Sequence, residues 1–419
     1  MKSITLNNFR CFEKIKLDFS EKVNLLVGDN ASGKTTIIRA LSAALGSFFT
    51  GFSDDNTRFA GLNKEDFRVV SAENGLANEK PVCVEFQWLE KTGKLVLNSP
   101  KGRTLTGPLR DLKLVGASLY KDLFLDGKQV KALPLITSFS TADIHKPRRI
   151  GSHLFKKYEH KPSFGYFECF QGDGFMKYWT LRLLALREAR TGETEISGVV
   201  NALKSALGPE GCNIVTDIDI RPIQRKVYYH LTDGRSVDSD NLSDGYRRLV
   251  SIVIDISFRC MLLNKGIYGI NACAMTEGTV LIDEIDLHLH PALQSSVMKG
   301  LQRGFPGVQF IITSHAPMVM TGVISNGNNR IIKLGYTSEE GYSARNIDAY
   351  GLDASTIIQA ILGVTPRSQE VEDQLATLFG LIDDDEYERA AQKLEQMRDE
   401  FSDNLPELSR AGAMLDFLK

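Results

Sequence analysis

The first fifty residues pass from an alternating pattern of apolar and polar positions to a helical one. Alternating or continuously apolar positions at 3–6, 13–19 and 23–27 predict three strands. Apolar residues then recur at helical spacing over 35–49, so a short glycine-bearing loop joins the third strand to a helix.

The rest of the chain continues this mixture of strands and helices. Uncharged apolar runs at 279–282 and 308–313 predict strands that are buried on both faces, as in a parallel sheet. Other predicted strands lie at 81–89, 94–97, 133–139, 213–221 and 226–231, with Thr92 and Gly93 at the first hairpin turn. Predicted helices lie at 175–188, 196–207, 244–263 and 291–303, whereas 50–78 is loop-rich. After about residue 353 the chain is expected to be helical, with residues 383–386 opening one helix. The succession predicts an α/β fold.

Length and composition indicate the number of folding units and the cellular compartment of the protein. The chain has 419 residues, enough for two or three folding units. Its six cysteines are scattered without a CxxC pair, which argues against a zinc ribbon or a disulfide framework. The start of the chain has a strand pattern rather than a signal peptide, and no run of about 20 apolar residues is present. We therefore expect a cytoplasmic protein without a membrane partner.

Charge is distributed unevenly along the chain. Residues 368–419 hold 14 acidic and 5 basic residues, whereas residues 1–367 hold 38 acidic and 45 basic residues. An acidic end on a mildly basic body is typical of a segment that docks a partner, although a solvated pair of helices has the same composition.

The segment Gly28-Asp29-Asn30-Ala31-Ser32-Gly33-Lys34-Thr35 matches the Walker A pattern GxxxxGK[ST] between a predicted strand and a predicted helix. Glycines let the backbone N–H groups face one phosphate, and the following helix points its positive end at the same place. Lys34 would contact the β- and γ-phosphates, and Thr35 would offer its hydroxyl to Mg²⁺. The expected nucleotide contacts are Gly28, Asn30, Ala31, Gly33, Lys34, Thr35 and Thr36.

A second motif ends the buried strand at 279–282. Asp283 and Glu284 follow this strand directly, as in a Walker B segment. Asp283 would hold Mg²⁺, and Glu284 would polarise the attacking water. An apolar strand capped by two solvated acids is the alternative, which the presence of the phosphate loop disfavours.

Two further motifs follow the same order as in one ATPase class. Leu242-Ser243-Asp244-Gly245-Tyr246-Arg247 opens a helix, and Thr313-Ser314-His315-Ala316-Pro317 follows a buried strand. Ser243 supplies a hydroxyl and Gly245 allows close backbone approach at a helix N-terminus, although Ser243 could also be an ordinary N-cap.

Taken together, the four motifs resemble the RecF/SMC-like branch of ABC ATPases. The resemblance implies an ABC-type P-loop ATPase head with a β-rich lobe, a helical lobe and a C-terminal helical extension. It implies ATP and Mg²⁺ as cofactors, with Glu284 and the switch residue His315 as the catalytic pair. The opening stretch Leu6-Asn7-Asn8-Phe9-Arg10-Cys11-Phe12 resembles the first strand of that branch, in which Arg10 would reach the nucleotide. Ser243 and Gly245 would contact ATP held by a second copy, so that two heads sandwich two ATPs.

The chain departs from this family at three places. Asp244 and Tyr246 replace the first glycine and the glutamine of the signature. The run 285–291 is similar to OLD-like defence ATPases, but His290 occupies the usual D-loop aspartate position. His288 and His290 could form a metal pair, but without a third ligand D-loop packing is favoured. The Q-loop glutamine has two candidate places, Gln171 and the strand end at 138–141, which has no glutamine.

The spacing of the motifs excludes some relatives. Residues between Thr35 and Leu242 form hairpins and short helices rather than the long coiled coil of SMC proteins. OLD-type nucleases carry a TOPRIM domain after the switch histidine, but here the only acidic cluster, Asp383 to Asp385, reads as a helix N-cap. We therefore expect no nuclease site. The ending is similar to ATPases of the Septu type, which also occur with retrons and partner an HNH nuclease.

Two functions follow as hypotheses. The first is an ATP-hydrolysing regulatory subunit of an anti-phage defence complex, with an ATPase head at 1–352 and a partner-docking segment at 353–419. The head comprises Walker A at 28–35, inserted segments at 50–240 and the signature-to-histidine region at 242–317. Its partners would be a second copy and an HNH nuclease, with DNA or a retron reverse transcriptase and its msDNA as further candidates. The alternative is a RecF-like DNA-binding repair ATPase, based on basic residues at 146–161 that could equally form a solvated loop or lid.

Overall fold

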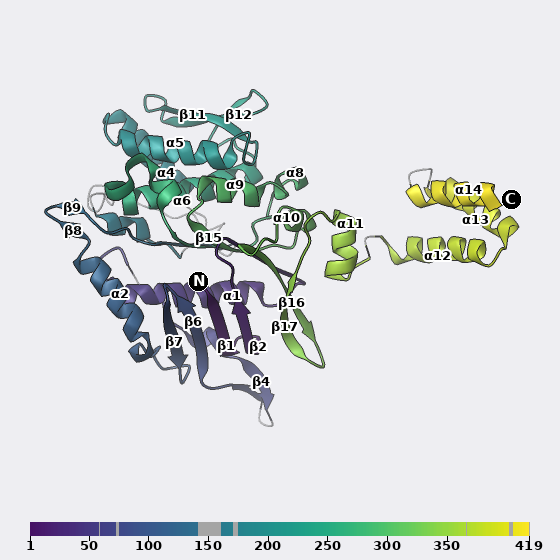
Figure 1. Cartoon of the computed structure of the whole chain (residues 1–419), viewed down its shortest axis with the longest axis horizontal. Coiled ribbons are helices and arrows are strands. Elements are labelled where there is room, and N and C mark those ends of the chain that lie inside the picture. The colour runs from purple at the N-terminus through teal and green to yellow at the C-terminus, as the bar shows by residue number, and fades with distance from the viewer. Residues whose placement is uncertain are drawn as a thin grey trace. The chain divides into compact units, whose positions relative to one another are not determined.

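The computed structural model describes residues 1–57, 59–72, 75–140, 161–170, 175–365, 367–401 and 405–418. The chain divides into two compact units, Met1–Leu352 and Asp353–Lys419 (Figure 1). In the described ranges no helix is both long and apolar enough to cross a lipid bilayer.

A six-stranded sheet forms the centre of the first unit. Its strands, in spatial order, are β10 (Leu135–Phe139), β14 (Gly278–Ile282), β15 (Val308–Thr313), β3 (Val23–Gly28), β16 (Asn329–Thr337) and β17 (Gly341–Ile347). The first five strands are parallel, and β17 pairs antiparallel with β16. Every residue of β3 and β15 is buried, which explains why both strands are uncharged and mostly apolar. The parallel arrangement brings the C-terminal ends of these strands to one edge of the sheet.

A second, antiparallel sheet forms the β-rich lobe. Its strands, in spatial order, are β2 (Phe12–Asp18), β1 (Ser3–Phe9), β6 (Val82–Trp88) and β7 (Lys91–Leu97). Helix α1 (Lys34–Gly46) contacts strands of both sheets and lies between them in Figure 1. Its nine buried residues show that it is covered on more than one side.

Helices cover the opposite face of the central sheet. They are α4 (Met176–Glu188), α5 (Glu193–Leu207), α6 (Asp244–Tyr268), α7 (Ala272–Met275), α8 (Pro291–Gln294), α9 (Val297–Gly304) and α10 (Pro317–Thr321). A three-stranded sheet, β11 (Val215–Arg221), β12 (Lys226–Leu231) and β13 (Ser236–Asp238), packs on α5. Inside this lobe Asp255 accepts hydrogen bonds from Trp179 and Arg259 of two helices, each at 2.6 Å.

The first unit also contains several short elements. They are α2 (Arg110–Lys121), the hairpins β4–β5 (Val69–Ala72, Gly75–Asn78) and β8–β9 (Phe124–Leu125, Lys128–Gln129), and 3₁₀ turns at Ser47–Thr50, Lys64–Asp66, Gly107–Leu109, Pro162–Tyr166 and Gly269–Asn271. None of the elements between 50 and 78 was expected from the loop-rich sequence there.

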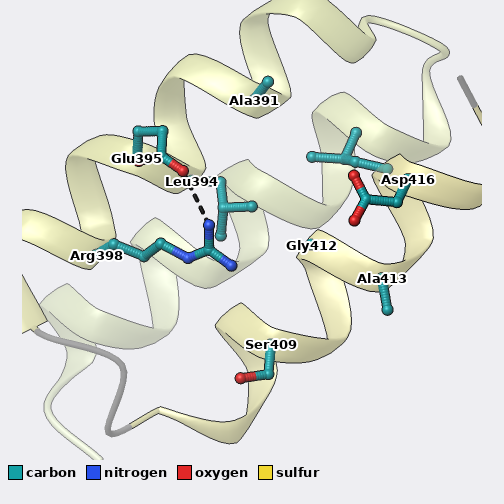
Figure 2. Close-up of a pocket in the computed structure, with 9 residues that line it drawn as sticks. Ala391, Leu394, Glu395, Arg398, Ser409, Gly412, Ala413 and Asp416 are labelled. Atoms are coloured by element: carbon teal, nitrogen blue, oxygen red, sulfur yellow. Dashed lines mark hydrogen bonds and ion pairs between the residues drawn. The ribbon is translucent and has the colours of Figure 1, made fainter.

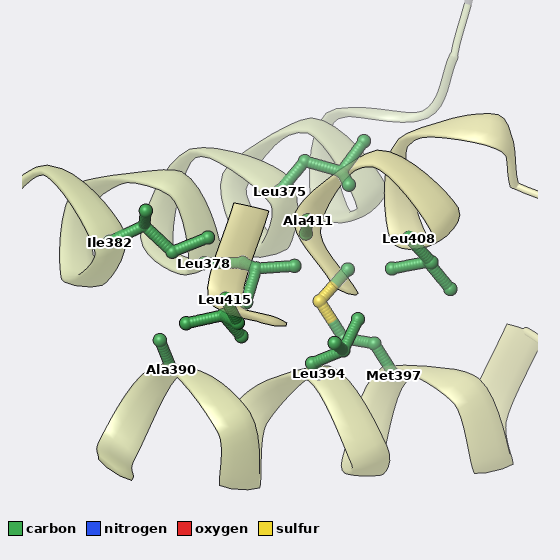
Figure 3. Packing of buried hydrophobic residues seen from close by; sticks show 9 residues of the cluster. All are labelled: Leu375, Leu378, Ile382, Ala390, Leu394, Met397, Leu408, Ala411 and Leu415. Carbon is green, nitrogen blue, oxygen red and sulfur yellow. The ribbon is translucent and has the colours of Figure 1, made fainter. Parts of the chain in front are cut away.

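The second unit is helical. It contains α11 (Ala354–Thr356), a π-helical turn (Ile357–Leu362), α12 (Gln369–Asp383), α13 (Tyr387–Phe401) and α14 (Pro406–Leu418). The last three helices share an apolar core that includes Leu378, Met397 and Leu408 (Figure 3). Between α13 and α14 a shallow pocket is lined by charged residues such as Glu395, Arg398 and Asp416 (Figure 2). The overall α/β prediction with a C-terminal helical extension is confirmed.

Three local predictions were wrong. The first hairpin turns at Leu89 and Glu90, both with positive φ, and Gly93 lies inside β7, where a Cβ would come within 2.4 Å of the Phe86 ring. The glycine therefore serves close packing rather than the turn.

The helix expected at 291–303 is divided into α8 and α9. Ser295 and Ser296 lie at the break, and their hydroxyls donate back to the carbonyls of Ala292 and Leu293. Such local bonds compete with the helical ladder. The prediction that residues 383–386 open a helix is wrong at its first residues, because α12 ends at Asp383 and Asp385 adopts a left-handed φ of 61°. Only Glu386 directly precedes α13, and its carbonyl accepts the N–H of Ala390 at 3.0 Å.

Candidate functional site

The loop 28–33 runs from β3 into α1 and has little room for side chains at its two glycines. A Cβ on Gly28, whose φ is 146°, would lie 2.3 Å from the carbonyl oxygen of Leu334. A Cβ on Gly33, whose φ is 91°, would lie 2.3 Å from the ring of Phe12. Glycine is therefore required at both ends of the loop, by backbone conformation and by space.

Lys34 folds back over this loop. Its ammonium group donates to the carbonyl oxygens of Gly28 and Asp29, at 2.8 Å each. Burial lowers the pKa of Lys34, and the charges of Asp29, Asp283, Glu284 and Asp286 oppose this shift. The Lys34 charge is therefore within electrostatic reach of Asp283 and Glu284, which the sequence assigned to Mg²⁺ binding and to catalysis.

The other loop residues differ in exposure. Asn30, Ala31 and Thr35 are exposed, and Thr36 is half-buried and accepts a weak hydrogen bond from the Cys11 thiol at 3.9 Å. Exposed groups at the start of a helix are accessible to an anion.

Asp283 ends β14 and is 1% exposed. Its Oδ1 accepts a hydrogen bond from the Thr313 hydroxyl at 2.6 Å, whereas its Oδ2 is buried and has no hydrogen-bond partner among the described residues. An unpartnered buried carboxylate oxygen is costly unless a cation or donor satisfies it. Asp283 therefore fits the hard oxygen ligand that Mg²⁺ requires, together with the exposed hydroxyl of Thr35.

Glu284 follows in a left-handed backbone conformation, with φ of 50°. Its N–H donates to the same Thr313 hydroxyl, at 2.7 Å, and its side chain is half-buried. Thr313 ends the neighbouring strand β15 and therefore positions both acidic residues. The sequence pattern assigned no role to Thr313, because a threonine at the end of a buried strand is common and its partners lie about thirty residues away in the chain.

Replacing Thr313 by valine keeps the shape of the side chain and removes the shared hydroxyl. We expect the free energy of unfolding to fall by about 1–3 kcal/mol and turnover of ATP to fall about tenfold. Thr279→Val is a matched control, because Thr279 is buried at the opposite end of β14 and donates to Gln309 at 3.1 Å. Urea unfolding and steady-state ATPase assays separate the effects. Equal turnover in the two variants would remove the positioning role of Thr313.

The loop after Glu284 packs against the segment that holds His315. The His315 N–H lies 3.4 Å from Asp286 Oδ1, which brings the predicted switch histidine next to the carboxylate loop. His290 caps α8 through Nδ1, which accepts from the Ala292 N–H at 3.3 Å. Among the residues that the structure describes, no group of three or more His, Cys, Asp or Glu side chains could hold a metal ion. This arrangement agrees with D-loop packing for 285–291.

The signature segment starts α6. Ser243 is the exposed N-cap residue of this helix, but its side chain makes no capping hydrogen bond. Gly245 is buried, and a Cβ there would lie 2.5 Å from the carbonyl oxygen of His288. The glycine thus allows a close contact with the loop 285–291 of its own chain.

Arg10 is held by a buried carboxylate. Its guanidinium contacts Asp66 at 2.9 Å, and Arg39 contacts the other oxygen of Asp66 at the same distance. Asp66 is fully buried. The structure therefore places Arg10 on Asp66, 56 residues away in sequence, a partner that the sequence pattern did not reveal.

The Q-loop remains unassigned. Gln171 and Thr141 lie outside the described residues. Ser138 lies near the end of β10, which pairs with β14 and therefore ends at the same edge of the sheet as Asp283. The Ser138 hydroxyl accepts a hydrogen bond from the Ser42 hydroxyl of α1 at 3.4 Å.

Comparisons with known proteins agree with this geometry. An AAA domain family matches residues 3–158, and a second AAA domain family, which its description links to the AbiEii toxin, Type IV TA system, matches residues 137–321. The Retron Vc95 probable ATPase of Vibrio cholerae serotype O1 biovar El Tor is 25% identical over 80% of this chain and 74% of its own length. Septu protein PtuA of Bacillus mycoides (strain KBAB4) is 29% identical over 77% of this chain, which spans only 39% of PtuA.

Among solved structures, an SMC head bound to the C-winged helix domain of ScpA is similar over 83% of this chain and 97% of its own, with 16% identity and a TM-score of 0.47. The chain is therefore similar to ATPases with AAA domains, and retron and Septu ATPases are among its relatives, in agreement with the motifs.

Proposed function

We propose that this ATPase is the regulatory subunit of an anti-phage defence complex, in which two copies close around ATP and control a partner nuclease of the HNH type. The observation that carries the ATPase role is the meeting of Lys34, Asp283 and Glu284 at one sheet edge, with Thr313 fixing both acids. The relatives named for retrons and for Septu support the defence setting.

The roles of the residues follow from their environments. Lys34 would exchange its two carbonyl acceptors for the β- and γ-phosphates, while the N–H groups of the loop surround the phosphate oxygens. Mg²⁺, when bound by Asp283 and Thr35, would neutralise phosphate charge. Glu284, half-buried and held by its backbone, would orient a water and accept its proton, and His315 would contact the γ-phosphate from the adjacent loop.

A second copy would complete each site. The Ser243 hydroxyl is exposed and makes no capping bond, so it is available to a phosphate of another chain. The start of α6 adds the positive end of a 25-residue helix. Asp244 is exposed beside it, and its carboxylate lies 3.7 Å from Arg247, which reduces repulsion of an anion.

The second unit is the proposed docking segment for the nuclease. Residues 368–419 hold 14 acidic and 5 basic residues, and Asp383, Asp384 and Glu388 are all exposed. A dense acidic surface steers a basic partner and gives association a strong dependence on salt.

This docking role can be tested by purifying the tagged full-length chain with its native neighbouring proteins. We expect a nuclease to co-purify with the wild-type chain, and at least tenfold less of it with the triple change of Asp383, Asp384 and Glu388 to lysine. Neutral Asn and Gln at the same positions should have a smaller effect. ATPase activity checks that the head is intact. Recovery of no nuclease with the wild-type chain would reject the proposed partner while leaving the ATPase assignment in place.

The alternative of a RecF-like DNA-binding protein rests on the basic stretch at 146–161. Of that stretch only Lys161 belongs to the described residues, and it lies 3.8 Å from Asp55 in an ion pair. The described residues therefore contain no feature that favours the alternative.

A further inference from the structure

Two tyrosines form an aromatic pair on the hairpin β16–β17. Tyr336 and Tyr342 are direct cross-strand partners, and their ring centroids lie 4.8 Å apart. Tyr336 is 62% exposed, so the pair is not part of the apolar core. An exposed aromatic ring can stack on a flat apolar group of a ligand.

This pair lies directly beside the phosphate loop. The Tyr342 hydroxyl donates to the carbonyl oxygen of Ala31 at 3.5 Å, the outer limit of a hydrogen bond. Its ring packs edge-on against Phe12 at 5.0 Å, and Phe12 in turn lies under Gly33. Strand β16 is also in contact with the loop, because Leu334 pairs with Gly28. Tyr342 therefore contacts the loop directly at Ala31, and the ring of Phe12 and the backbone of β16 connect the hairpin to the loop at Gly33 and Gly28.

The order of the strands gives the direction in which a nucleotide would lie. Asp283 and Glu284 follow β14, which is two strands from β3 on one side. The tyrosine hairpin starts with β16, the neighbour of β3 on the other side. A triphosphate held by Lys34 with its γ-phosphate facing Glu284 must extend its nucleoside away from the carboxylates. That direction leads toward Tyr342 and Tyr336.

We propose that Tyr342 and Tyr336 form a nucleobase-stacking subsite next to the phosphate loop. This inference rests on the proposed function, since it concerns the same nucleotide. The loop contacts the phosphates, and the tyrosine rings add affinity for the flat base. Because every base has a π face, stacking raises the affinity for nucleotides over bare phosphate chains without strong selection among bases.

The same pair could instead serve only to stabilise the hairpin, as cross-strand aromatic pairs do. The two roles differ in which ligands they affect. A damaged hairpin would distort the loop and weaken every polyphosphate, whereas a lost stacking surface would weaken only ligands that carry a base.

Calorimetric titration of the full chain with ATP and with inorganic tripolyphosphate distinguishes these roles. We expect Tyr342→Ala to weaken ATP binding about tenfold and to leave tripolyphosphate binding unchanged. Tyr336→Ala should act in the same direction, and Tyr342→Phe, which keeps the ring, should bind ATP nearly as the wild type does. Tyr350→Ala is a matched control, because Tyr350 is 56% exposed and lies outside the hairpin.

Unchanged ATP affinity in both alanine variants would overturn the subsite. An equal loss of affinity for ATP and tripolyphosphate would overturn it as well, in favour of a structural role. If the wild-type chain bound tripolyphosphate as tightly as ATP, the base would have no subsite here. A wild-type chain that binds neither ligand would reject the nucleotide site itself, and with it the proposed function.

Discussion

Replacing Glu284 by glutamine is expected to lower the rate of ATP hydrolysis by about 10²–10⁴-fold and to leave ATP binding intact. The amide has nearly the shape of the carboxylate but cannot accept the proton of the attacking water. The backbone of Glu284 is fixed by its N–H bond to Thr313, so the amide side chain should occupy the same place. Phosphate release measures the rate, and calorimetry measures the affinity.

Glu277→Gln is the matched control, because Glu277 is exposed and precedes the opposite end of β14. It should hydrolyse ATP at the wild-type rate. If two chains close around ATP as proposed and open after hydrolysis, the Glu284 variant should also accumulate as ATP-bound dimers, which light scattering would detect. Unchanged turnover in Glu284→Gln would show that another group activates the water.

Lys34→Ala is expected to weaken ATP binding tenfold or more, because a charge-assisted contact contributes roughly 1.5–3 kcal/mol. Lys34 carries the buried positive charge of the loop, and the neutral backbone N–H groups of the loop cannot replace that charge. Lys22→Ala is the control, since Lys22 lies just before β3 and donates to the Pro306 carbonyl at 2.6 Å. Equal affinities in the two variants would place the nucleotide elsewhere.

The same variant tests whether two chains share each site. Lys34→Ala and Ser243→Arg should each be inactive alone, because each damages one half of every site. In an equal mixture, half of the dimers contain one copy of each variant, and one of their two sites is then intact. About a quarter of wild-type activity should return if each site acts independently. Absence of recovery would mean that Lys34 and Ser243 act in the same chain or in separate sites.

The motifs and their flanking elements could be predicted because they depend on local sequence. The buried strands β3, β14 and β15 are uncharged and mostly apolar. Gly28 at the end of β3 and the acidic pair Asp283 and Glu284 after β14 mark the edge of the site. The hairpin β16–β17 was missed, since its exposed and buried positions do not alternate regularly. Because the hairpin was not predicted, the sequence did not indicate that Tyr336 and Tyr342 lie side by side.

Contacts between distant residues account for the remaining differences. The Thr313 hydroxyl contacts both Asp283 and Glu284 across a gap of about thirty residues. Asp66, in a segment predicted to be loop, holds Arg10 and Arg39. Neither set has a characteristic spacing, because the tertiary fold and not the local chain brings the partners together. Side-chain roles of this kind become visible only with the fold.

The contact between Gly245 and His288 has a consequence for a dimer of such chains. It joins the helix that would reach the neighbour's ATP to the loop that follows the chain's own Glu284. A shift of that loop on nucleotide binding would therefore move Ser243, because a packed backbone contact leaves no room for independent movement. Each chain would then transmit the state of its own nucleotide to that of its neighbour. Occupancy of the two sites would be cooperative, with a Hill coefficient above 1, and the complex would respond to ATP as a threshold rather than in proportion.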